Sequence, residues 1–371
     1  MGKRDSQVNL LEHSKAKVTL LGKYLQRYLN IIANDGYTQR IKIYDLYCGD
    51  GIYDNKEEGS PLVILRAIKE LHSENVSRLK QIIPIDCQFN DIENEKVLKV
   101  KEAVEKELLH SPEFGEIIFT VEDYQVEVKR LLAELPKLKK QKKFIFIDPY
   151  GYKNIKPSDI KAILECGDTE VLLFLPTQFM YRFDRKGTPP ALKEFNDELN
   201  IIQDERNTIS DWQYIEQLKV RFRELVSERY FVDTFTIEKD PNTIFCLFFF
   251  CNHIRGFEKM IDAKWEIDTE RGKGYSYKGG NLELFSPTYE LESKLKKYLE
   301  DGQRSNGDIY EFTLRLGFRP KHAKHIFESW QKIPNNFVVV DSKGKVARKG
   351  SFYINYDDYK NHHNKVNFKL I

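Results

Sequence analysis

Residues Arg40–Tyr53 read RIKIYDLYCGDGIY, a short apolar run that ends on Asp45 and enters a turn with two glycines, Gly49 and Gly51. An apolar run of this length, bounded by turn residues, predicts a buried strand. Glycines directly after a strand allow positive φ and let a ligand approach the backbone. The pattern is typical of a nucleotide-type ligand site in a doubly wound sheet, or else of a tight strand-to-helix turn. The third glycine of the dinucleotide fingerprint is missing.

The composition is that of a protein with a proper hydrophobic core. The chain has 371 residues, of which 41% are hydrophobic and 31% charged, so we expect two domains. The longest apolar run, Ile244–Cys251, has strand length, and no run approaches the roughly 20 residues of a membrane helix. The N-terminus has no signal-peptide pattern. The five cysteines form no C-x-x-C pair, which favours reduced thiols in a cytoplasmic protein over disulfides or a zinc site.

Basic residues are concentrated toward the C-terminus. Residues 288–371 carry 16 Lys and Arg against 10 Asp and Glu, although the formal net charge of the whole chain is only +2. Within this region, Arg315–Lys349 holds nine basic residues and two acidic ones. A basic module on a mildly acidic body predicts that one end of the protein meets a polyanion.

Two more strand-like runs are followed by acidic residues. Residues 81–89 (QIIPIDCQF) precede Asp91, and residues 116–121 (EIIFTV) precede Asp123. An acid after the second strand of a doubly wound sheet binds a ribose, which predicts this role for Asp91. The N-cap of the following helix is an alternative, and the two roles are compatible. Asp123 can accept a hydrogen bond from an exocyclic amine such as that of adenine, or it can be a simple turn residue.

Asp148 and the residues after it form the second unusual turn of the chain. Residues 143–152 read KFIFIDPYGY, so a fourth strand delivers Asp148-Pro149-Tyr150 to the same edge as the glycine turn. The Asp148 carboxylate and the Pro149 carbonyl can both accept hydrogen bonds from a substrate amine, and the proline fixes the backbone. Tyr150 or Tyr152 offers a face for stacking a planar base. Such a turn favours catalysis by positioning; a rigid turn that only closes the strand is the alternative.

The remaining periodicity completes a doubly wound α/β domain. A helix over 13–32 precedes the first strand, and Ser60, as the N-cap before Pro61, begins a helix whose amide end can face the same ligand. Further strands are expected at 170–174 and 243–251. The charged helical stretch at about 189–230 is expected to be an insertion over the ligand edge. We place this α/β domain at 1–285 and a second domain at 286–371.

The second domain has the pattern of a winged helix. Three short helices, over 289–300, 308–316 and from Pro320, are followed by the strand-like runs FVVVD and SFYINY around a basic, glycine-bearing tip. The third helix would enter a groove and the wing would contact phosphate; a protein-binding winged helix is the alternative. No carboxylate or Cys partner is spaced with the histidines, so we expect no metal site. The expected nucleic-acid contacts are Lys321, His322, Lys324, His325, Lys343, Lys345, Arg348 and Lys349.

In combination, these motifs resemble those of the three-Cys-motif partner proteins, a group of bacterial methyltransferase-like proteins whose name refers to cysteines in a neighbouring protein. The resemblance covers about 13–270. The matching segments are HSKAK at 13–17, DLYCGDGIY at 45–53, EGSPL at 58–62, FIDPYGY at 146–152, LPTQFMYRF at 175–183 and KMIDAKWEID at 259–268.

The resemblance implies a class I methyltransferase fold with S-adenosylmethionine as methyl donor. It implies that Asp45, Gly49 and Gly51, with Tyr47 and Ser60 beside them, line the methionine part of the donor. Asp91 would take the ribose and Asp123 the adenine. Asp148-Pro149-Tyr150 lies where amino-methyltransferases carry Asp-Pro-Pro-Tyr, although the third position here is Tyr150 and the fourth is Gly151.

Three functions follow from these expectations. The first is a methyltransferase that acts on an exocyclic amine of a nucleic-acid base, with Asp148, Pro149 and Tyr150 at the reacting amine and DNA or RNA as partner. The second is a non-catalytic partner or regulator that binds DNA or protein through the winged helix. The third is the methylation of a protein or small molecule, with the winged helix serving as a dimer arm. A three-Cys-motif protein is a further expected partner, by resemblance alone.

Overall fold

The computed structural model describes residues 12–80, 83–185, 187–201, 210–240, 243–276 and 288–371. These residues form two compact units. The first unit contains the described residues of Met1–His253 and the strand Gly274–Ser276, and the second contains Ile254–Lys273 and the described residues of Lys278–Ile371. Residues 254–273 are therefore grouped with the C-terminal part of the chain, whereas the sequence-based boundary at 285 left them in the first domain.

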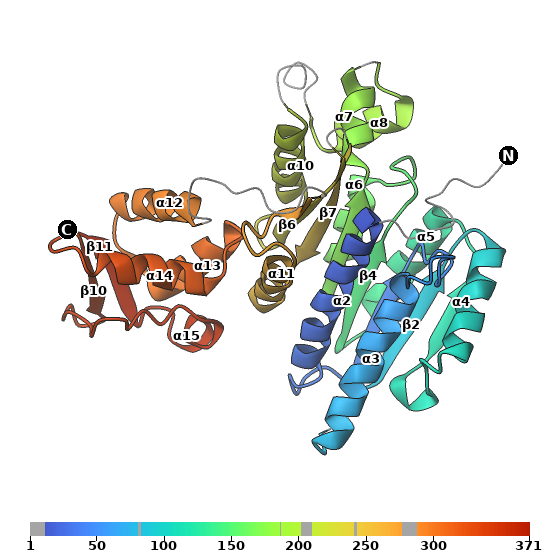
Figure 1. The fold of residues 1–371 in the computed structure, drawn as a ribbon, viewed down its shortest axis with the longest axis horizontal. Helices are drawn as coiled ribbons and strands as arrows, with labels where there is room; N and C mark the ends of the chain where they lie inside the picture. The colour runs from blue at the N-terminus through green and yellow to red at the C-terminus, as the bar shows by residue number, and fades with distance from the viewer. Residues whose placement is uncertain (1–11, 81–82, 186, 202–209, 241–242, 277–287) are drawn as a thin grey trace. The chain divides into compact units, whose positions relative to one another are not determined.

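Within the described residues, one sheet of eight strands organises the first unit (Figure 1). Its strand order is β3-β2-β1-β4-β5-β7-β6-β8. Strands β1 to β5 are parallel, and β7 is antiparallel to both β5 and β6. The order reverses between β1 and β4, which makes the sheet Rossmann-like and doubly wound. The strands are β1 Arg40–Asp45, β2 Ile85–Asn90, β3 Ile117–Thr120, β4 Gln141–Ile147, β5 Thr169–Leu175, β6 Phe231–Asp240, β7 Thr243–Cys251 and β8 Gly274–Ser276.

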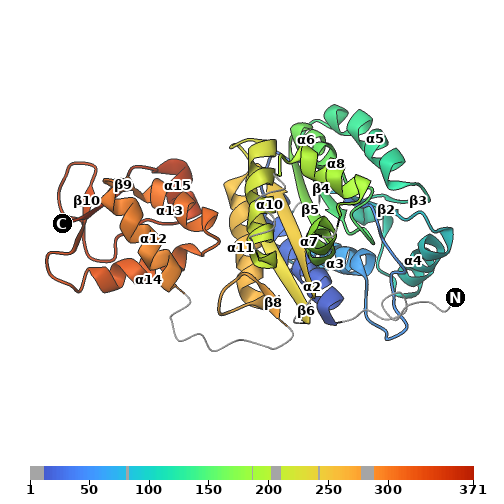
Figure 2. The same cartoon turned by 90° about the horizontal axis from the view of Figure 1, so that it is seen from above.

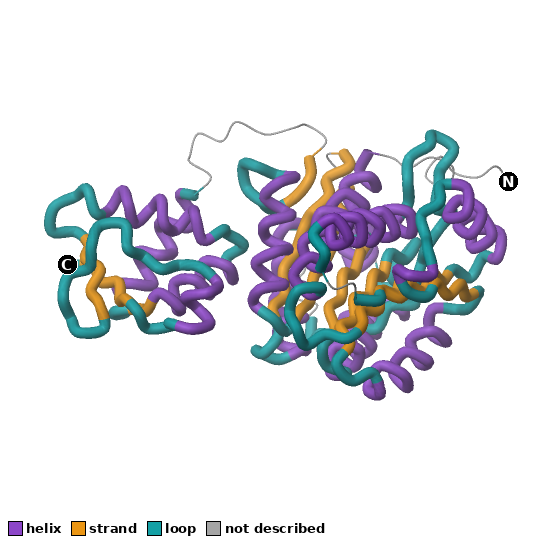
Figure 3. Tube along the Cα trace, turned by 90° about the horizontal axis from the view of Figure 1, so that it is seen from below, coloured by secondary structure: helices purple, strands orange, loops and turns teal. Residues whose placement is uncertain are grey.

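Helices cover both faces of this sheet (Figures 2 and 3). One face carries α2 Glu12–Ile32, α3 Ser60–Ser77 and α4 Asn94–Lys106. The other carries α5 Tyr124–Glu134, α6 Pro157–Glu165, α8 Pro190–Glu198 and α10 Asp211–Val226, while α7 Thr177–Arg185 follows β5. Because both faces are covered, β7 and the carboxyl-terminal halves of β4 and β5 are continuous apolar runs instead of alternating.

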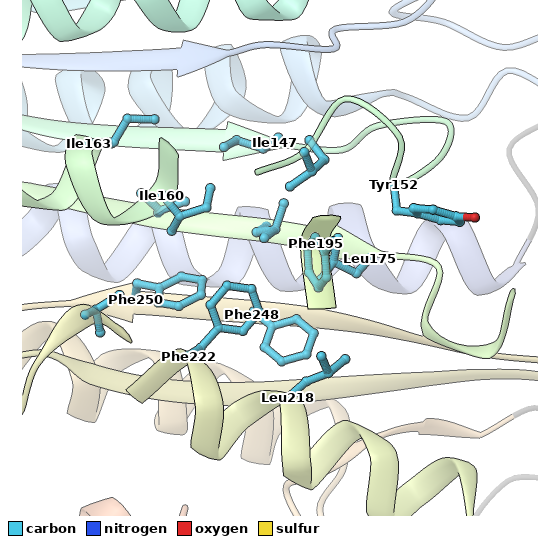
Figure 4. Packing of buried hydrophobic residues seen from close by; sticks show 14 of the residues in the cluster. Ile147, Tyr152, Ile160, Ile163, Leu175, Phe195, Leu218, Phe222, Phe248 and Phe250 are labelled. Atoms are coloured by element: carbon cyan, nitrogen blue, oxygen red, sulfur yellow. The ribbon is translucent and has the colours of Figure 1, made fainter. Parts of the chain in front are cut away.

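Strand β7 shows how the two layers share the core. On one face, the Phe222 ring of α10 packs against Phe248 and Phe250, with ring centroids 5.3 and 5.2 Å apart (Figure 4). On the other face, Phe249 packs edge-on against Tyr24 of α2 at 4.9 Å. The uninterrupted apolar sequence of this strand is therefore explained by aromatic packing on both sides.

The strand register brings the predicted site residues to one edge of the sheet. Asp45, the last residue of β1, lies opposite Phe89 of β2 and Phe146 of β4. Asp91 comes two residues after Phe89, and Asp148 comes two residues after Phe146. Both therefore lie just beyond the strand ends, beside Asp45. The carboxyl ends of β1, β2 and β4 thus meet at the point where the strand order reverses, which is where open α/β sheets bind their ligands.

The structure differs from the expectation for 189–230. Helix α10 connects β5 to β6 and buries Tyr214, Ile215, Leu218 and Phe222 in the main core. It is therefore one of the layers of the doubly wound fold and not an addition over the ligand edge. Strand β6, which follows it, was not predicted from the sequence.

The second unit contains helices and a small antiparallel sheet. The sheet order is β10-β11-β9, and Phe327 of α14 packs against Phe337 of β10 and Phe368 of β11 at 5.0 and 4.9 Å. The three C-terminal helices predicted from periodicity, α12, α13 and α14, are present. The elements are α11 Ile254–Ile267, α12 Tyr289–Glu300, β9 Arg304–Ser305, α13 Asn306–Arg315, α14 Pro320–Trp330, β10 Phe337–Asp341, α15 Tyr356–Asn361 and β11 Val366–Leu370.

The prediction of a strand at SFYINY (351–356) is wrong. Phe352 and Ile354 are buried, which gives the segment the alternation of a strand. Between them, however, Tyr353 adopts a φ of +53°, which interrupts an extended conformation, and helix α15 begins at Tyr356. The strand that pairs with β10 is instead β11, at the end of the chain.

Candidate functional site

The glycine turn after β1 has the backbone geometry that the sequence predicts. Gly49 and Gly51 have φ values of +63° and +77°. A Cβ on Gly51 would lie 3.1 Å from a methyl group of Val100 in α4, so the position is both conformationally and sterically restricted. The Gly51 carbonyl accepts a hydrogen bond of 2.6 Å from the Gly59 amide, which ties the turn to the start of α3. Gly59 is the N-cap of this helix, and Ser60 is its first residue.

Asp45 is fully buried at the end of β1. Its Oδ1 accepts a hydrogen bond from the Tyr47 amide at 3.3 Å. Its Oδ2 atom has no hydrogen-bond partner among the described residues. Burial raises the pKa of Asp45 to about 7, and the neighbouring carboxylates of Asp148 and Asp91 act in the same direction. A buried acceptor of this kind is costly unless a ligand or water supplies the missing donor.

Asp91 joins the end of β2 to the glycine turn. Its carboxylate accepts from the Gly49 amide at 3.3 Å and from the Glu93 amide at 3.0 Å, and Lys96 Nζ lies 3.6 Å away. Burial raises its pKa despite these partners. Asp91 therefore positions the turn, in addition to any contact it makes with a ligand.

Asp123 and Tyr47 lie on the β3 side of the site. Asp123 is the N-cap of α5 and accepts from the Gln125 amide at 2.8 Å, which explains an acid at this position without a ligand. The Tyr47 ring stacks on Tyr124, with centroids 5.3 Å apart. The role of Asp123 in holding an adenine stays a prediction.

Asp148 has a partner that sequence reasoning did not assign to it. Nζ of Lys17, in the second turn of α2, donates to Oδ1 at 2.8 Å and to Oδ2 at 2.6 Å. It also lies 4.1 Å from the ring centroid of Phe174 in β5. Only 12% of the Lys17 side chain and 20% of the Asp148 side chain are exposed. The signal in the sequence was the HSKAK segment at 13–17, which contains Lys17 and opens the first predicted helix.

Tyr150 and Tyr152 have different environments. Tyr150 is 67% exposed, and its hydroxyl and ring are both contacted by Lys96. Tyr152 is buried in the main core (Figure 4). Of the two, Tyr150 is therefore the side chain whose face is accessible for stacking. It follows Pro149, which is itself buried.

Cys48 is not a reactive thiol. Its side chain is buried, and its amide donates to the Asn90 carbonyl at 2.8 Å. Burial raises the pKa of the thiol, with Asp45 and Asp91 adding to the effect. The thiolate required of a nucleophile is thus disfavoured.

Most of the basic residues predicted to contact nucleic acid are exposed in the second unit. Lys343, Lys345, Arg348 and Lys349 lie in the loop after β10, and all four are exposed. On α14, Lys321 and His325 are exposed and Lys324 is half-buried.

His322 differs from the other residues of that set. Its ring packs 4.2 Å from the Trp265 ring of α11, and its Nδ1 accepts from the Arg319 amide at 3.3 Å. Burial lowers its pKa to about 4. The expectation that it belongs to the exposed basic face is corrected accordingly, because it helps to hold α14 against α11.

Two further expectations concern absences. In the described part of the chain, no group of three or more His, Cys, Asp or Glu side chains is arranged to hold a metal ion. The helices described by the structure include none that is long and apolar enough to cross a membrane.

No family model and no curated protein matches this chain. Solved structures similar to it include an O-methyltransferase from Bacillus cereus in complex with SAH, with 12% identity and a TM-score of 0.35, over 67% of this chain and 91% of that one. The O-methyltransferase TomG from Streptomyces achromogenes, in complex with SAM, has 10% identity and a TM-score of 0.33, over 66% and 90%. A loganic acid methyltransferase with SAH has 9% identity and a TM-score of 0.31, over 80% and 92%. Because these TM-scores are low, the strand order and the contacts of the site carry the inferences that follow.

Proposed function

We propose that the protein is an S-adenosylmethionine-dependent methyltransferase. The observation that carries the proposal is the buried Oδ2 of Asp45, for which the described part of the chain supplies no hydrogen-bond donor, beside a two-glycine turn at the reversal of strand order. The reversed β7 between β5 and β6 fits the class I methyltransferase fold that the sequence resembles.

The charge of the site favours S-adenosylmethionine as the ligand over a nucleotide phosphate. Three carboxylates, those of Asp45, Asp91 and Asp148, lie close enough for Asp91 and Asp148 both to raise the pKa of Asp45. Carboxylates attract cations, and S-adenosylmethionine carries an ammonium and a sulfonium. Its ammonium would give Asp45 Oδ2 the missing hydrogen bond, and a ribose hydroxyl would donate to Asp91. When bound, the donor supplies an electrophilic methyl group.

For the acceptor we propose an exocyclic amine of a nucleic-acid base. The carboxylate of Asp148 and the carbonyl of Pro149 would orient the amine, and the exposed Tyr150 would stack the base. A base inside a duplex would first have to be flipped out. The binding of an amine by both oxygens of Asp148 is already illustrated by Lys17.

The second unit supports nucleic acid as the polymer. Its helix–strand sequence, α12-β9-α13-α14-β10-β11 with α15 inserted, and its sheet order fit a winged helix in which α14 is the third helix. We propose that α14 enters a groove and that the basic loop after β10 contacts phosphate.

A specific observation also favours the non-catalytic alternative. Lys17 fills both oxygens of Asp148, so a substrate amine has to displace an ion pair before it can bind. A protein that only senses the donor, or that serves as a partner of a three-Cys-motif protein, would have no need to open this pair.

One experiment separates these possibilities. Calorimetric titration with S-adenosylmethionine is followed by labelled-methyl transfer to total cellular DNA and RNA, for the wild type and Asp148→Asn. The methyltransferase proposal expects donor binding by both proteins and transfer by the wild type, reduced at least a hundredfold in the variant. Donor binding with salt-dependent nucleic-acid affinity and no transfer would instead support the regulator, and absence of donor binding would overturn the enzymatic proposal.

A further inference from the structure

The amine of Lys17 occupies the position that the proposed function assigns to a substrate amine. Its Nζ lies 2.8 and 2.6 Å from the two oxygens of Asp148, directly after β4. A lysine ammonium has three N–H donors, so this two-point contact fixes the direction of the third. Asp148 thus orients the Lys17 nitrogen as it would orient the amine of a base.

The surroundings of Lys17 hold the nitrogen firmly in this position. Helix α2 is anchored in the core by buried residues that directly follow Lys17, including Val18, Leu20 and Leu21. The Phe174 ring lies 4.1 Å from Nζ, and an aromatic face binds methylated ammonium groups as well as unmodified ones. The position therefore suits both an acceptor amine and its methylated product.

We propose that Lys17 Nζ is itself a methyl acceptor, and that the protein methylates this lysine with S-adenosylmethionine. The inference rests on the proposed function, because Asp148 serves there as the group that orients an amine. Nζ first loses a proton to water through Asp148. It then forms a bond to the methyl carbon, the carbon–sulfur bond breaks, and its electron pair stays on sulfur to give S-adenosylhomocysteine. The product is an N-methyl-lysine, which keeps its positive charge.

The neighbouring Lys15 provides a matched control. It lies on the same helix, two residues earlier, and pairs with Glu57 at 2.7 Å at the surface. It is therefore a lysine of the same segment that does not contact Asp148. Lys17→Arg keeps a cation able to pair with Asp148 but removes the lysine amine.

The test uses the full chain and two readouts. Intact mass and peptide mapping of the purified protein should show an increase of about 14 Da per methyl group at Lys17. Incubation with labelled S-adenosylmethionine should then label wild type and Lys15→Arg but not Lys17→Arg. Because the reaction is intramolecular, the fraction labelled per unit time should not change over a tenfold range of protein concentration.

The outcomes separate this inference from the proposed function. Donor binding by calorimetry without mass increase or label at Lys17 would overturn the inference alone. If Lys17→Arg or Lys17→Met then transfers methyl groups to nucleic acid faster than wild type, Lys17 is a plug that substrates displace and not an acceptor. Label that persists in Lys17→Arg also contradicts the inference, and absence of donor binding overturns both proposals.

Discussion

At Asp45, burial and the proposed binding of the S-adenosylmethionine ammonium act on the same proton. Burial raises the pKa of this carboxyl to about 7 in the free protein, so at pH 6 most molecules carry it protonated. An ammonium binds the carboxylate form, so donor binding must release the proton. We therefore predict that the Kd for S-adenosylmethionine increases about tenfold from pH 8 to pH 6 and is nearly constant above pH 8, as measured by calorimetry at each pH.

Two variants show whether this pH dependence belongs to Asp45. Asp45→Asn should bind the donor more weakly and with little change between pH 6 and 8. Asp50→Asn, which removes a carboxylate of the same turn that pairs with Lys99 at 3.3 Å, should keep the wild-type pH profile. A profile that survives in Asp45→Asn would show that another group is responsible.

At the scale of the element, the glycine turn combines a positive φ, which strains any residue with a Cβ, with close packing. Gly51 and Gly36 have similar φ values, +77° and +73°, but a Cβ would meet Val100 at 3.1 Å in the first and nothing within 4 Å in the second. Gly36→Ala should therefore cost about 1 kcal/mol of unfolding free energy from backbone strain alone. Gly51→Ala should cost more, about 2–3 kcal/mol, and should also weaken donor binding, because the turn must move away from α4.

Denaturant unfolding and donor titration of the two variants check this prediction. Equal losses of unfolding free energy in the two variants would mean that the contact with Val100 adds nothing to the cost of a side chain at Gly51. Normal donor affinity in Gly51→Ala would mean that the turn does not line the donor site.

The elements that sequence analysis predicted are those whose signal is local. Strand β1 and strand β4 are apolar runs that end on turn residues, and their site residues follow directly in the chain. Strand β6 was missed because FVDTFTIEKD is rich in polar residues. Its buried Asp233 is compensated by Lys219 of α10, 3.1 Å away, which no local pattern indicates.

The same reason explains what was missed at the site. Lys17 meets Asp148 across 131 positions of sequence, so the pair becomes visible only when the fold places α2 beside the end of β4. Tyr150 and Tyr152 could not be told apart from sequence, because their exposure depends on the core beneath the turn. Asp45 and the two glycines were predictable, since strand, acid and turn are contiguous.

At the scale of the whole molecule, the proposed contact of the basic C-terminal part with nucleic acid predicts a salt dependence of binding. The exposed Lys343 and Lys345 lie in the basic loop after β10, whereas Lys296 and Lys297 are exposed on α12. Each phosphate neutralised releases counterions, so a logarithmic plot of affinity against salt has a slope of about −0.9 per phosphate contact on duplex DNA. Replacing Lys343 and Lys345 with Gln should reduce the size of that slope by about 2. Replacing Lys296 and Lys297 with Gln should leave the slope unchanged.

Fluorescence anisotropy with a labelled duplex over a range of salt concentrations measures the slopes of both double variants. An equal change in the two double variants would show that net charge alone attracts the polymer, whereas no change in either would assign the second unit to protein contacts.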